Sequence, residues 1–292
     1  MGVGGLLSVE NPRKTDSIPL AWGFPRLHRR RRFSVPDSFY RDLGGGRFES
    51  TVHAQGAWNP AEQHMAPISG LLTHCLLECE PREGMQLSRV SFDILGMIPG
   101  GEFEVTTAVV RPGRTIELLE ARMESGGRTA IVARAWRLST QDTTAVAAVE
   151  DPRMPGPEEA GPHEGMTAWP GGYIRSLEVR VLPGLRPGRG QVWLRNPYPL
   201  LDTGPVADVV RLVGMMDAAN GIASRVPPGG DSWMFPNVDL QIHLHRMPRG
   251  EWLGLDTRVT FGESGVGLTS SVVHDLDGPF GRLEQILTVR KL

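Results

Sequence analysis

The 292-residue sequence has only two cysteines, three tyrosines and no long uninterrupted run of apolar residues. Two cysteines in a chain of this length argue against a secreted fold held together by disulfides. No apolar run reaches the roughly 18 residues that a membrane-spanning helix needs. The formal net charge is −2, so charge gives no reason to expect nucleic acid as the main partner. These absences predict a soluble globular protein.

The two cysteines also give little reason to expect a metal site. Cys75 and Cys79 lie four residues apart in LLTHCLLEC, on one face of a predicted helix. A metal site would need more ligands at suitable spacing. We therefore interpret both as small apolar core residues and predict neither a metal nor another cofactor.

The start of the sequence lacks the cationic segment and apolar core of a signal peptide. Its dense basic run, HRRRR at residues 28–32, is interpreted as a solvated segment, with weak binding to anionic surfaces as the alternative. We expect residues 1–35 to form a poorly ordered leader and the protein to be cytoplasmic.

A stretch rich in Pro, Gly and Glu divides the remaining sequence into two parts of similar size. Residues 141–171 have the composition of a linker, with too little apolar content to pack alone. The sequence therefore predicts an N-terminal domain over 36–140 and a C-terminal domain over 172–292.

The two parts resemble each other, which indicates an internal repeat. QGAWNP at 55–60 and QVWLRNP at 191–197 each precede a helical pattern, and strand patterns follow in both parts. Gly126-Gly127 and Asp277-Gly278 are two-residue hairpin signals at matching places. The pattern in each half predicts a strand, then one long helix, then three or four antiparallel strands that curl around the helix. Two such copies would pack about a pseudo-twofold axis.

Three polar residues of the second half stand where a core would not require them. Asp217 lies in the mostly apolar run LVGMMDAANG, Asn237 begins the strand pattern NVDLQIHLH, and Gln285 lies in RLEQILTV. A buried carboxylate is costly unless it is hydrogen-bonded, and amide side chains are natural partners. Each residue alone has an ordinary explanation: a helix surface, a strand-entry turn or an exposed strand position. Together, on one helix and two strands, they predict a polar site.

The strand that follows Asn237 alternates apolar residues with polar ones, and His243 and His245 share its polar face. We interpret the two histidines as structural residues at the seam between the halves, with a general-base role as the alternative. We expect the polar face of this strand to be shielded from bulk water.

Several stretches, in this order, resemble one known family. QHMAPISGLL, VVRPGRTIELLEARM, MMDAANGI, FPNVDLQIHLHRMPRGEWLGLD and HDLDGPFGRLEQ are similar to the acyl-CoA thioesterase-like proteins, in particular the type II acyl-CoA thioesterase branch. The resemblance covers roughly residues 36–292. It implies an α+β double hotdog fold, in which two tandem antiparallel sheets each wrap around a central helix.

The resemblance also implies a catalytic function. Family members hold the attacking water with a helix Asp, a strand Thr or Ser and a late-strand Gln. Carried over by position, these residues are Asp217, Asn237 and Gln285, which implies an acyl-thioester hydrolase. Asn237 departs from the hydroxyl pattern, since its amide can hold a water but cannot serve as a nucleophile.

A second departure lies in the loop before the first helix. The family often has Gly-Gly there, which lets backbone N–H groups approach the thioester carbonyl, whereas this sequence has Met65 and Ala66. The helix N-terminus still supplies N–H groups and the positive end of the helix dipole. His64 is a candidate donor beside them, with a solvated loop residue as the alternative.

The expected partner is an acyl-CoA or an acyl-carrier thioester, and the sequence leaves the oligomeric state open, a homo-oligomer included. A binding protein that has lost catalysis and a hotdog hydratase are the alternatives, and MMDAANG has no His of the kind expected for the hydratase. The acyl chain would lie between sheet and helix. The candidate wall residues, which plain core packing would explain equally, are Met215, Met216, Trp233, Met234 and Phe235.

Overall fold

A computed structural model describes Met1 and residues 38–163, 170–226 and 233–291. The chain divides into two units, residues 1–34 and 35–292, and all elements named below belong to the second unit. The predicted leader at residues 1–35 lies, apart from Met1, outside the described residues.

The first half of the chain forms one long helix, α1, and the strands β1 to β6. The helix comes after the first two strands and a short 3-10 helix, η1. The bounds are β1 (Tyr40–Gly44), β2 (Arg47–Ser50), η1 (Val52–Ala54), α1 (Met65–Glu78), β3 (Met85–Ile94), β4 (Glu102–Arg111), β5 (Ile116–Ser125) and β6 (Arg128–Ser139).

The second half repeats this order, with short elements added. The main repeat elements are β9 (Arg189–Arg195), α3 (Asp208–Met216), β11 (Asp239–Leu244), β12 (Leu253–Phe261), β13 (Val266–Asp275) and β14 (Gly278–Thr288). The additional elements are η2 (Thr144–Val146), β7 (Gly161–Pro162), α2 (Gly172–Ser176), β8 (Glu178–Val181), α4 (Ala219–Ile222), β10 (Trp233–Met234) and β15 (Arg290–Lys291).

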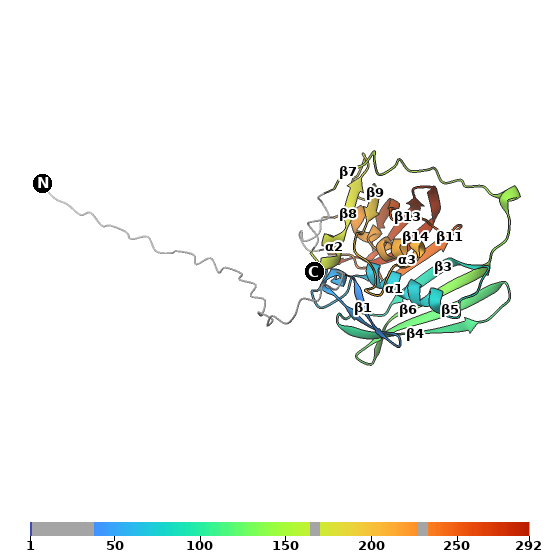
Figure 1. Cartoon of the computed structure of the whole chain (residues 1–292). Coiled ribbons are helices and arrows are strands. Elements are labelled where there is room, and N and C mark those ends of the chain that lie inside the picture. The colour runs from blue at the N-terminus through green and yellow to red at the C-terminus, as the bar shows by residue number, and fades with distance from the viewer. Residues whose placement is uncertain (2–37, 164–169, 227–232, 292) are drawn as a thin grey trace. The chain divides into compact units, whose positions relative to one another are not determined.

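The strands of both halves join into one antiparallel sheet (Figure 1). Its 13 strands follow the order β1-β2-β4-β5-β6-β3-β11-β14-β13-β12-β9-β8-β7. The order β2-β4-β5-β6-β3 in the first half is mirrored by β11-β14-β13-β12-β9 in the second. The halves meet where β3 pairs with β11, with Val90 opposite Ile242. This arrangement agrees with the predicted duplication and α+β class.

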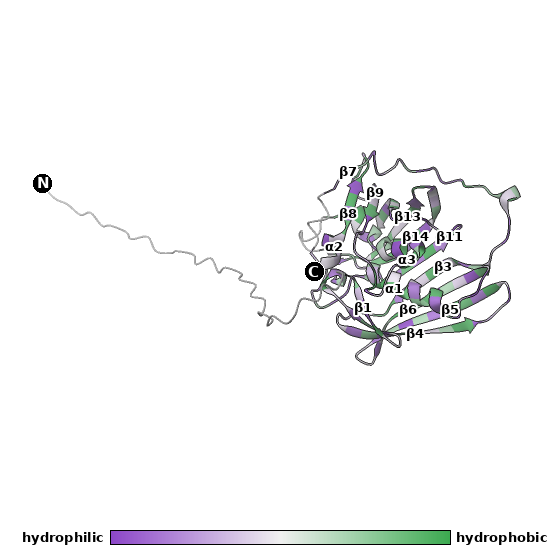
Figure 2. Cartoon of the chain, in the orientation of Figure 1, coloured by the Kyte–Doolittle hydropathy of each residue, from purple (hydrophilic) through white to green (hydrophobic). Residues whose placement is uncertain are grey.

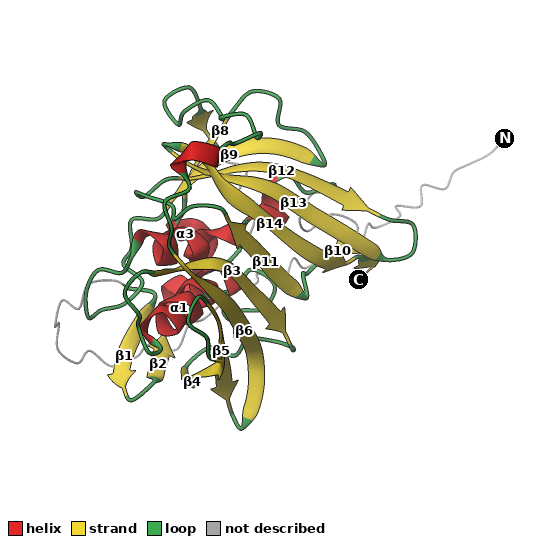
Figure 3. Ribbon diagram, turned by 90° about the vertical axis from the view of Figure 1, so that its right-hand side faces the viewer, coloured by secondary structure: helices red, strands yellow, loops and turns green. Residues whose placement is uncertain are grey.

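The sheet curls around α1 and α3, which lie side by side (Figure 3). They approach closely at two glycines: a Cβ on Gly70 would lie 3.0 Å from the Gly214 Cα and 3.0 Å from the Val210 carbonyl oxygen. Ser69 strengthens the crossing, since its hydroxyl lies 2.7 Å from the Ala66 carbonyl oxygen and 3.0 Å from that of Val213. Glycine at position 70 therefore sets the distance between the two helices.

Alternating polarity along the strands lets one face of the sheet pack on these helices (Figure 2). In β11, Leu240 and Ile242 are buried against the helices, whereas His243 is exposed on the other face. Asp239 on that outer face accepts a 2.7 Å hydrogen bond from the Ile286 N–H of β14. The strand lies at the seam as predicted. The expectation that both histidines are shielded is wrong, because His243 and His245 are exposed.

The predicted long helix of the second half is interrupted. α3 ends at Met216 and α4 begins at Ala219. Between them the Ala218 N–H bonds the Met215 carbonyl and the Asn220 N–H bonds the Asp217 carbonyl, which is the tighter i to i+3 pattern. Asp, Asn and Gly are weak helix formers, so the run DAANG favours such an end. The interruption leaves Asp217 at the C-terminal end of α3.

The predicted hairpins are present. Gly126 and Gly127, with φ of 57° and 73°, link β5 to β6, while the β13–β14 turn lies one residue earlier than predicted, at Leu276-Asp277. In the predicted linker, Met154 is buried beside Trp193, and the Trp193 indole N–H donates to the Pro155 carbonyl at 2.8 Å. The domain boundaries at 140 and 172 stay predictions.

No helix of the described residues is long and apolar enough to cross a membrane.

Candidate active site

The carboxylate of Asp217 is held through one of its two oxygens. Its Oδ1 accepts hydrogen bonds from the Asn237 Nδ2, at 2.7 Å, and from the Gln285 Nε2, at 2.8 Å. Asp217 is only 5% exposed and Gln285 is fully buried. The structure thus brings the three predicted residues together, with Oδ2 left outside this pair of amide bonds.

Each of these side chains comes from a different element of the second half. Asp217 follows the last turn of α3, Asn237 precedes β11 opposite Leu287, and Gln285 lies on the helix-facing side of β14. The Asn237 amide also donates to the Asp239 carbonyl at 2.9 Å, which fixes its orientation. The cluster is therefore set by the fold of the second half alone.

The first half contributes His64, whose Nδ1 lies 3.5 Å from Asp217 Oδ2. His64 caps α1: its Nδ1 accepts a 3.1 Å hydrogen bond from the Ala66 N–H. Its ring also packs on Tyr173, with centroids 4.4 Å apart. Because Nδ1 accepts from the helix, the proton of the neutral ring is on Nε2. Nε2 has no hydrogen-bond partner within the described residues.

Burial moves the pKa values of the two facing groups in opposite directions. It raises the pKa of Asp217 from 3.8 to about 6, although the hydrogen bonds from Asn237 and Gln285 oppose this shift. Burial lowers the pKa of His64 to about 3, so the imidazole is neutral at pH 7. Asp217 is therefore ionised at neutral pH, and its buried negative charge lowers the stability of the folded chain.

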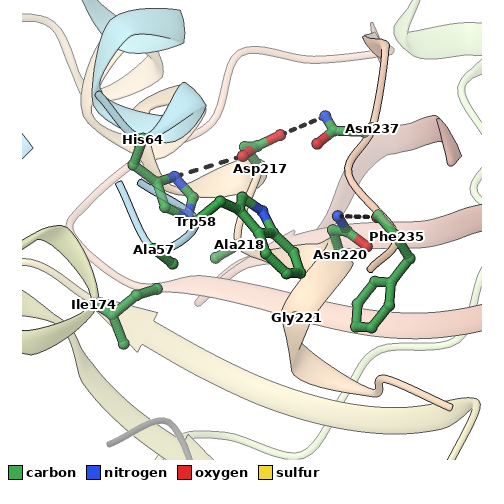
Figure 4. Close-up of a pocket in the computed structure, with 10 residues that line it drawn as sticks. All are labelled: Ala57, Trp58, His64, Ile174, Asp217, Ala218, Asn220, Gly221, Phe235 and Asn237. Carbon is green, nitrogen blue, oxygen red and sulfur yellow. Dashed lines mark hydrogen bonds and ion pairs between the residues drawn. The ribbon is translucent and has the colours of Figure 1, made fainter. Parts of the chain in front are cut away.

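Two cavities meet at Asp217, His64 and Asn237, and Figure 4 shows the residues that line the smaller one. The small cavity, about 50 Å³, is lined by Ala57, Trp58, His64, Ile174, Asp217, Ala218, Asn220, Gly221, Phe235 and Asn237. The large cavity, about 390 Å³, extends past Met65, Met97, Ile98, Met234 and Thr288 to Arg290. Residues of both halves of the chain line each cavity. The Asp217 carboxylate lines both, so it lies between two cavities of different size.

The predicted oxyanion loop is only partly available. Met65 lines the large cavity, and its N–H has no acceptor among the residues that the structure describes. Ala66 is fully buried, and its N–H is engaged by His64. His64 lines both cavities. The loop thus presents the Met65 N–H and the His64 ring, whereas the Ala66 N–H is used for the helix cap.

The predicted acyl-wall residues separate into two groups. Phe235 lines the small cavity and Met234 the large one. Met215 and Met216 lie in the hydrophobic core and line neither cavity. Trp233 is 46% exposed and also lines neither.

Sequence reasoning missed four residues of the site. Trp58 lies in the repeat stretch QGAWNP, and Asn220 lies three residues after Asp217 on the same helical face, so both had a visible signal. Tyr173 and Ile174 come from α2, which lies against η1, where a Cβ on Gly172 would meet the Val52 carbonyl. Only the pair Gly171-Gly172 hinted at that close approach.

Around the carboxylate, some buried polar atoms lack a partner. Gln285 Oε1, Asn220 Oδ1 and Thr269 Oγ1 make no hydrogen bond within the described part of the chain. Thr269 and Gln285 are directly opposite across β13 and β14. Buried polar atoms are normally satisfied by protein, water or ligand, so these atoms indicate where such groups bind. Within the described residues, no group of three or more His, Cys, Asp or Glu could hold a metal.

The chain belongs to the acyl-CoA thioesterase family. Residues 54–138 match the family's N-terminal domain and residues 152–289 match its C-terminal domain. This confirms the resemblance in the sequence. A sequence comparison with curated proteins returns no match.

Solved structures confirm the double hotdog fold. A conserved hotdog-fold protein of unknown function from Alicyclobacillus acidocaldarius has a TM-score of 0.68 at 15% identity, covering 86% of this chain and 96% of its own. An acyl-CoA thioesterase II from Mycobacterium marinum has a TM-score of 0.61 at 16% identity, covering 87% and 96%. The dehydratase domain of RzxB from Pseudomonas fluorescens, with a TM-score of 0.52 at 14% identity, covers 88% and 98%. Since thioesterases and a dehydratase share the fold, the function has to be argued from the site.

Proposed function

We propose that the protein hydrolyses acyl thioesters carried by CoA. The observation that supports this most strongly is the buried Asp217 carboxylate, whose Oδ1 is held by two amides while Oδ2 faces His64 where two cavities meet. A carboxylate with a pKa near 6 is ionised at neutral pH and basic enough to take a proton from water. A thioester carbonyl has one substituent on each side, which two cavities can accommodate.

In the proposed reaction Asp217 Oδ2 takes a proton from a water molecule. At the same time the oxygen of that water attacks the thioester carbonyl carbon. The carbonyl electron pair moves to the oxygen and gives a tetrahedral oxyanion. When that oxyanion collapses, the carbon–sulfur bond breaks and the thiolate leaves, taking the proton back from Asp217. The products are a carboxylic acid and a thiol. Asn237 and Gln285 keep Oδ1 fixed, which aims Oδ2 at the water.

His64 has two roles in this proposal. Its Nε2–H, with the Met65 N–H, donates to the developing oxyanion in place of the family's glycine loop. Its Nδ1 accepts from the Ala66 N–H, which keeps the neutral ring in place 3.5 Å from Asp217 Oδ2 without adding a charge beside the carboxylate. Neutral imidazole suits both roles, and the lowered pKa of His64 keeps it neutral across the working pH range.

A second candidate is an acyl-thioester-binding protein without turnover. Two observations favour it: Asn237 stands where the family has a hydroxyl, and the Ala66 N–H is already bound to His64. The structure of Asn237 argues for retained catalysis, because its amide makes the 2.7 Å bond to Asp217 that a shorter hydroxyl would have to make.

The test is a panel of acyl-CoA and acyl-carrier-protein thioesters, with thiol release followed by a dye and acid release by mass spectrometry. Turnover with CoA substrates that yields thiol and free acid in equal amounts supports hydrolysis. Saturable binding of the same compounds without thiol release supports the binding protein.

A cytoplasmic location and a role in lipid metabolism belong to the same proposal. Cys75 and Cys79 are both free thiols, as expected in a reducing compartment.

Removing one amide should change the pH dependence as well as the rate. In Asn237→Ala, Asp217 loses a hydrogen bond that lowers its pKa, so the acidic limb of kcat/KM should move upward from about pH 6. We expect kcat at pH 8 to fall about tenfold to a hundredfold, because Oδ2 is less well oriented. The measurement is kcat/KM against pH between 5 and 9.

Gln241→Ala is the matched control, since this amide lies on β11 and reaches Asp239 on the outer face. It should leave both the rate and the limb unchanged. An acidic limb that stays in place in Asn237→Ala would show that the limb does not report on Asp217.

A further inference from the structure

We infer that the preferred substrates are thioesters of short acyl groups that carry a hydroxyl, with the acyl group in the small cavity beside Asn220 and the pantetheine arm in the large cavity. This inference rests on the proposed function and specifies its substrate. It follows from the unequal cavities, from the unpaired polar atom in the small one and from the charges beside the large one.

The two cavities diverge from a shared region that contains the reacting groups. Ala57, Trp58, His64, Asp217 and Asn237 line both, and the remaining wall residues differ. A thioester whose carbonyl lies at Asp217 therefore directs its two substituents into different cavities. The pantetheine arm is long and must reach solvent, because the nucleotide of CoA is too large for either space.

The small cavity limits the group that it can hold. Its volume is about 50 Å³. This is about one eighth of the volume of the large cavity, so the small cavity suits the shorter of the two substituents. Ile174, at 6% exposure, and the fully buried Phe235 form its walls together with helix α4 (Figure 4). We therefore assign a short acyl group to this cavity.

Asn220 gives this cavity a polar wall. The residue is 8% exposed, and its Nδ2 donates to the Phe235 carbonyl at 3.1 Å. Its Oδ1 is buried and has no partner within the described residues. The amide orientation is set by the Nδ2 bond, so the free atom is an acceptor that requires a donor. A hydroxyl on the acyl group supplies one, and an aliphatic chain does not.

The position of Asn220 suits a hydroxyl near the thioester. Asn220 lies three residues after Asp217, so the two side chains are neighbours on one helical face. In the substrate, a hydroxyl on the third acyl carbon is likewise close to the carbonyl carbon that the water attacks. With the carbonyl carbon beside Asp217, this hydroxyl would therefore be near Asn220.

The large cavity leads to cationic side chains. Arg290 lines it, and Lys291 follows on β15, which pairs with β10. Neither side chain forms an ion pair within the described residues. Arg and Lys without partners are suited to the phosphates of CoA. Glu62 also lines this cavity, and burial raises its pKa.

The first experiment measures kcat/KM for butyryl-, 3-hydroxybutyryl-, octanoyl- and palmitoyl-CoA. We expect both four-carbon substrates to exceed palmitoyl-CoA at least tenfold, and 3-hydroxybutyryl-CoA to exceed butyryl-CoA about tenfold. A preference for palmitoyl-CoA would overturn the assignment of the small cavity. Equal rates for the two four-carbon substrates would overturn the role of the hydroxyl and leave Asn220 to a bound water.

Two matched variants assign the cavities. Ile174 and Ile98 are similarly buried isoleucines, one in each cavity. Ile174→Ala should shift the preferred acyl chain upward by about two carbons, while Ile98→Ala should leave the preference unchanged. The reverse pattern would place the acyl group in the large cavity. In Asn220→Leu, the ratio of the 3-hydroxybutyryl to the butyryl rate should fall to about one, and this ratio does not depend on the fraction of folded protein.

Binding separates this inference from the proposed function. Ketone analogues of the four acyl-CoAs, with a methylene between sulfur and carbonyl, cannot be hydrolysed, and their Kd values can be measured by calorimetry. The tightest binding should be to the 3-hydroxybutyryl analogue, even if no thioester is turned over. If the 3-hydroxybutyryl analogue binds most tightly but no thioester is turned over, hydrolysis is refuted and the substrate assignment stands. If thioesters are turned over but the order of binding is reversed, the substrate assignment is refuted and hydrolysis stands.

Discussion

Asp217→Asn should lower kcat by about 10²- to 10⁴-fold while leaving the fold intact. The amide has the shape of the carboxylate, but it cannot take a proton from water. Its oxygen can still accept from Asn237 and Gln285, so the arrangement of the three side chains should be kept. The measurement is thiol release with a saturating acyl-CoA at pH 8.

The same variant should be more stable than the wild type above pH 6. The pKa of Asp217 is about 6 in the folded chain and near 4 in the unfolded chain. Between these values the folded state binds more protons, so stability decreases as the pH rises and the full cost is present above about pH 6. Removing the charge should stabilise the chain by about 2–3 kcal/mol at pH 8 and have little effect at pH 4.

Asp93→Asn is a suitable control for both measurements, because Asp93 is an exposed carboxylate on the outer face of β3. It should change neither the rate nor the pH dependence of stability. Unchanged hydrolysis in Asp217→Asn would eliminate Asp217 as the base, and a loss of stability at pH 8 would contradict the cost assigned to its charge.

Gly70→Val should produce the largest loss of stability. A Cβ at this position lies 3.0 Å from the Gly214 Cα and from the Val210 carbonyl oxygen, and both are backbone atoms that cannot move independently. The two central helices must separate, which loosens the core of both halves. We expect a loss of about 3 kcal/mol and a Tm lower by about 6–12 °C, measured by thermal unfolding at pH 7.

Gly214→Ala tests this explanation at the other side of the crossing. There a Cβ meets the Gly70 Cα at 3.6 Å and the Ala66 carbonyl oxygen at 3.8 Å, which are ordinary contacts. The gain in helix propensity, up to about 1 kcal/mol, should make this variant neutral or slightly more stable. Similar losses in both variants would show that helix separation is not what Gly70 controls.

The duplicated fold was visible in the sequence because the evidence for it is local. The hairpin at Gly126-Gly127 and the matched stretches at 55–60 and 191–197 required no knowledge of distant contacts. The end of α3 at Met216 was less visible, since apolar periodicity continues past it to Ala219 and Ile222. Propensity at DAANG decides that boundary, and periodicity does not report it.

The polar cluster was predictable for a different reason. Asp217, Asn237 and Gln285 are unusual for their local surroundings, and they lie together on one helix and two strands of the same half. Met215 and Met216 show the limit of such patterns, because helical spacing cannot distinguish a core residue from a cavity wall.

His64 and Ile174 reach the site through contacts between distant segments. The sequence gave His64 only as a candidate donor beside the first helix, and only Gly171-Gly172 hinted at the place of Ile174. The helix cap by His64 depends on a single side-chain rotamer, and the place of Ile174 depends on α2 lying against η1.

The pseudo-twofold axis explains why the site occurs once. The crossing pairs Gly70 with Gly214, so the counterpart of Asp217 in α1 is Thr73. Thr73 is buried, and its hydroxyl donates to the Ser69 carbonyl at 2.7 Å within the helix. The first half therefore lacks the carboxylate at the equivalent place and supplies His64 to the site of the second half.

An infrared titration of the Asp217 carboxyl group tests the proposed chemistry most directly. The difference between wild-type and Asp217→Asn spectra isolates its C=O stretch, which can be followed from pH 4 to pH 8 beside kcat/KM for an acyl-CoA. The band of the protonated acid should disappear with a midpoint near pH 6, and the rate should rise with the same midpoint. A midpoint near pH 4, or a rate that rises independently of the band, would contradict the assignment of Asp217 as the base that activates water.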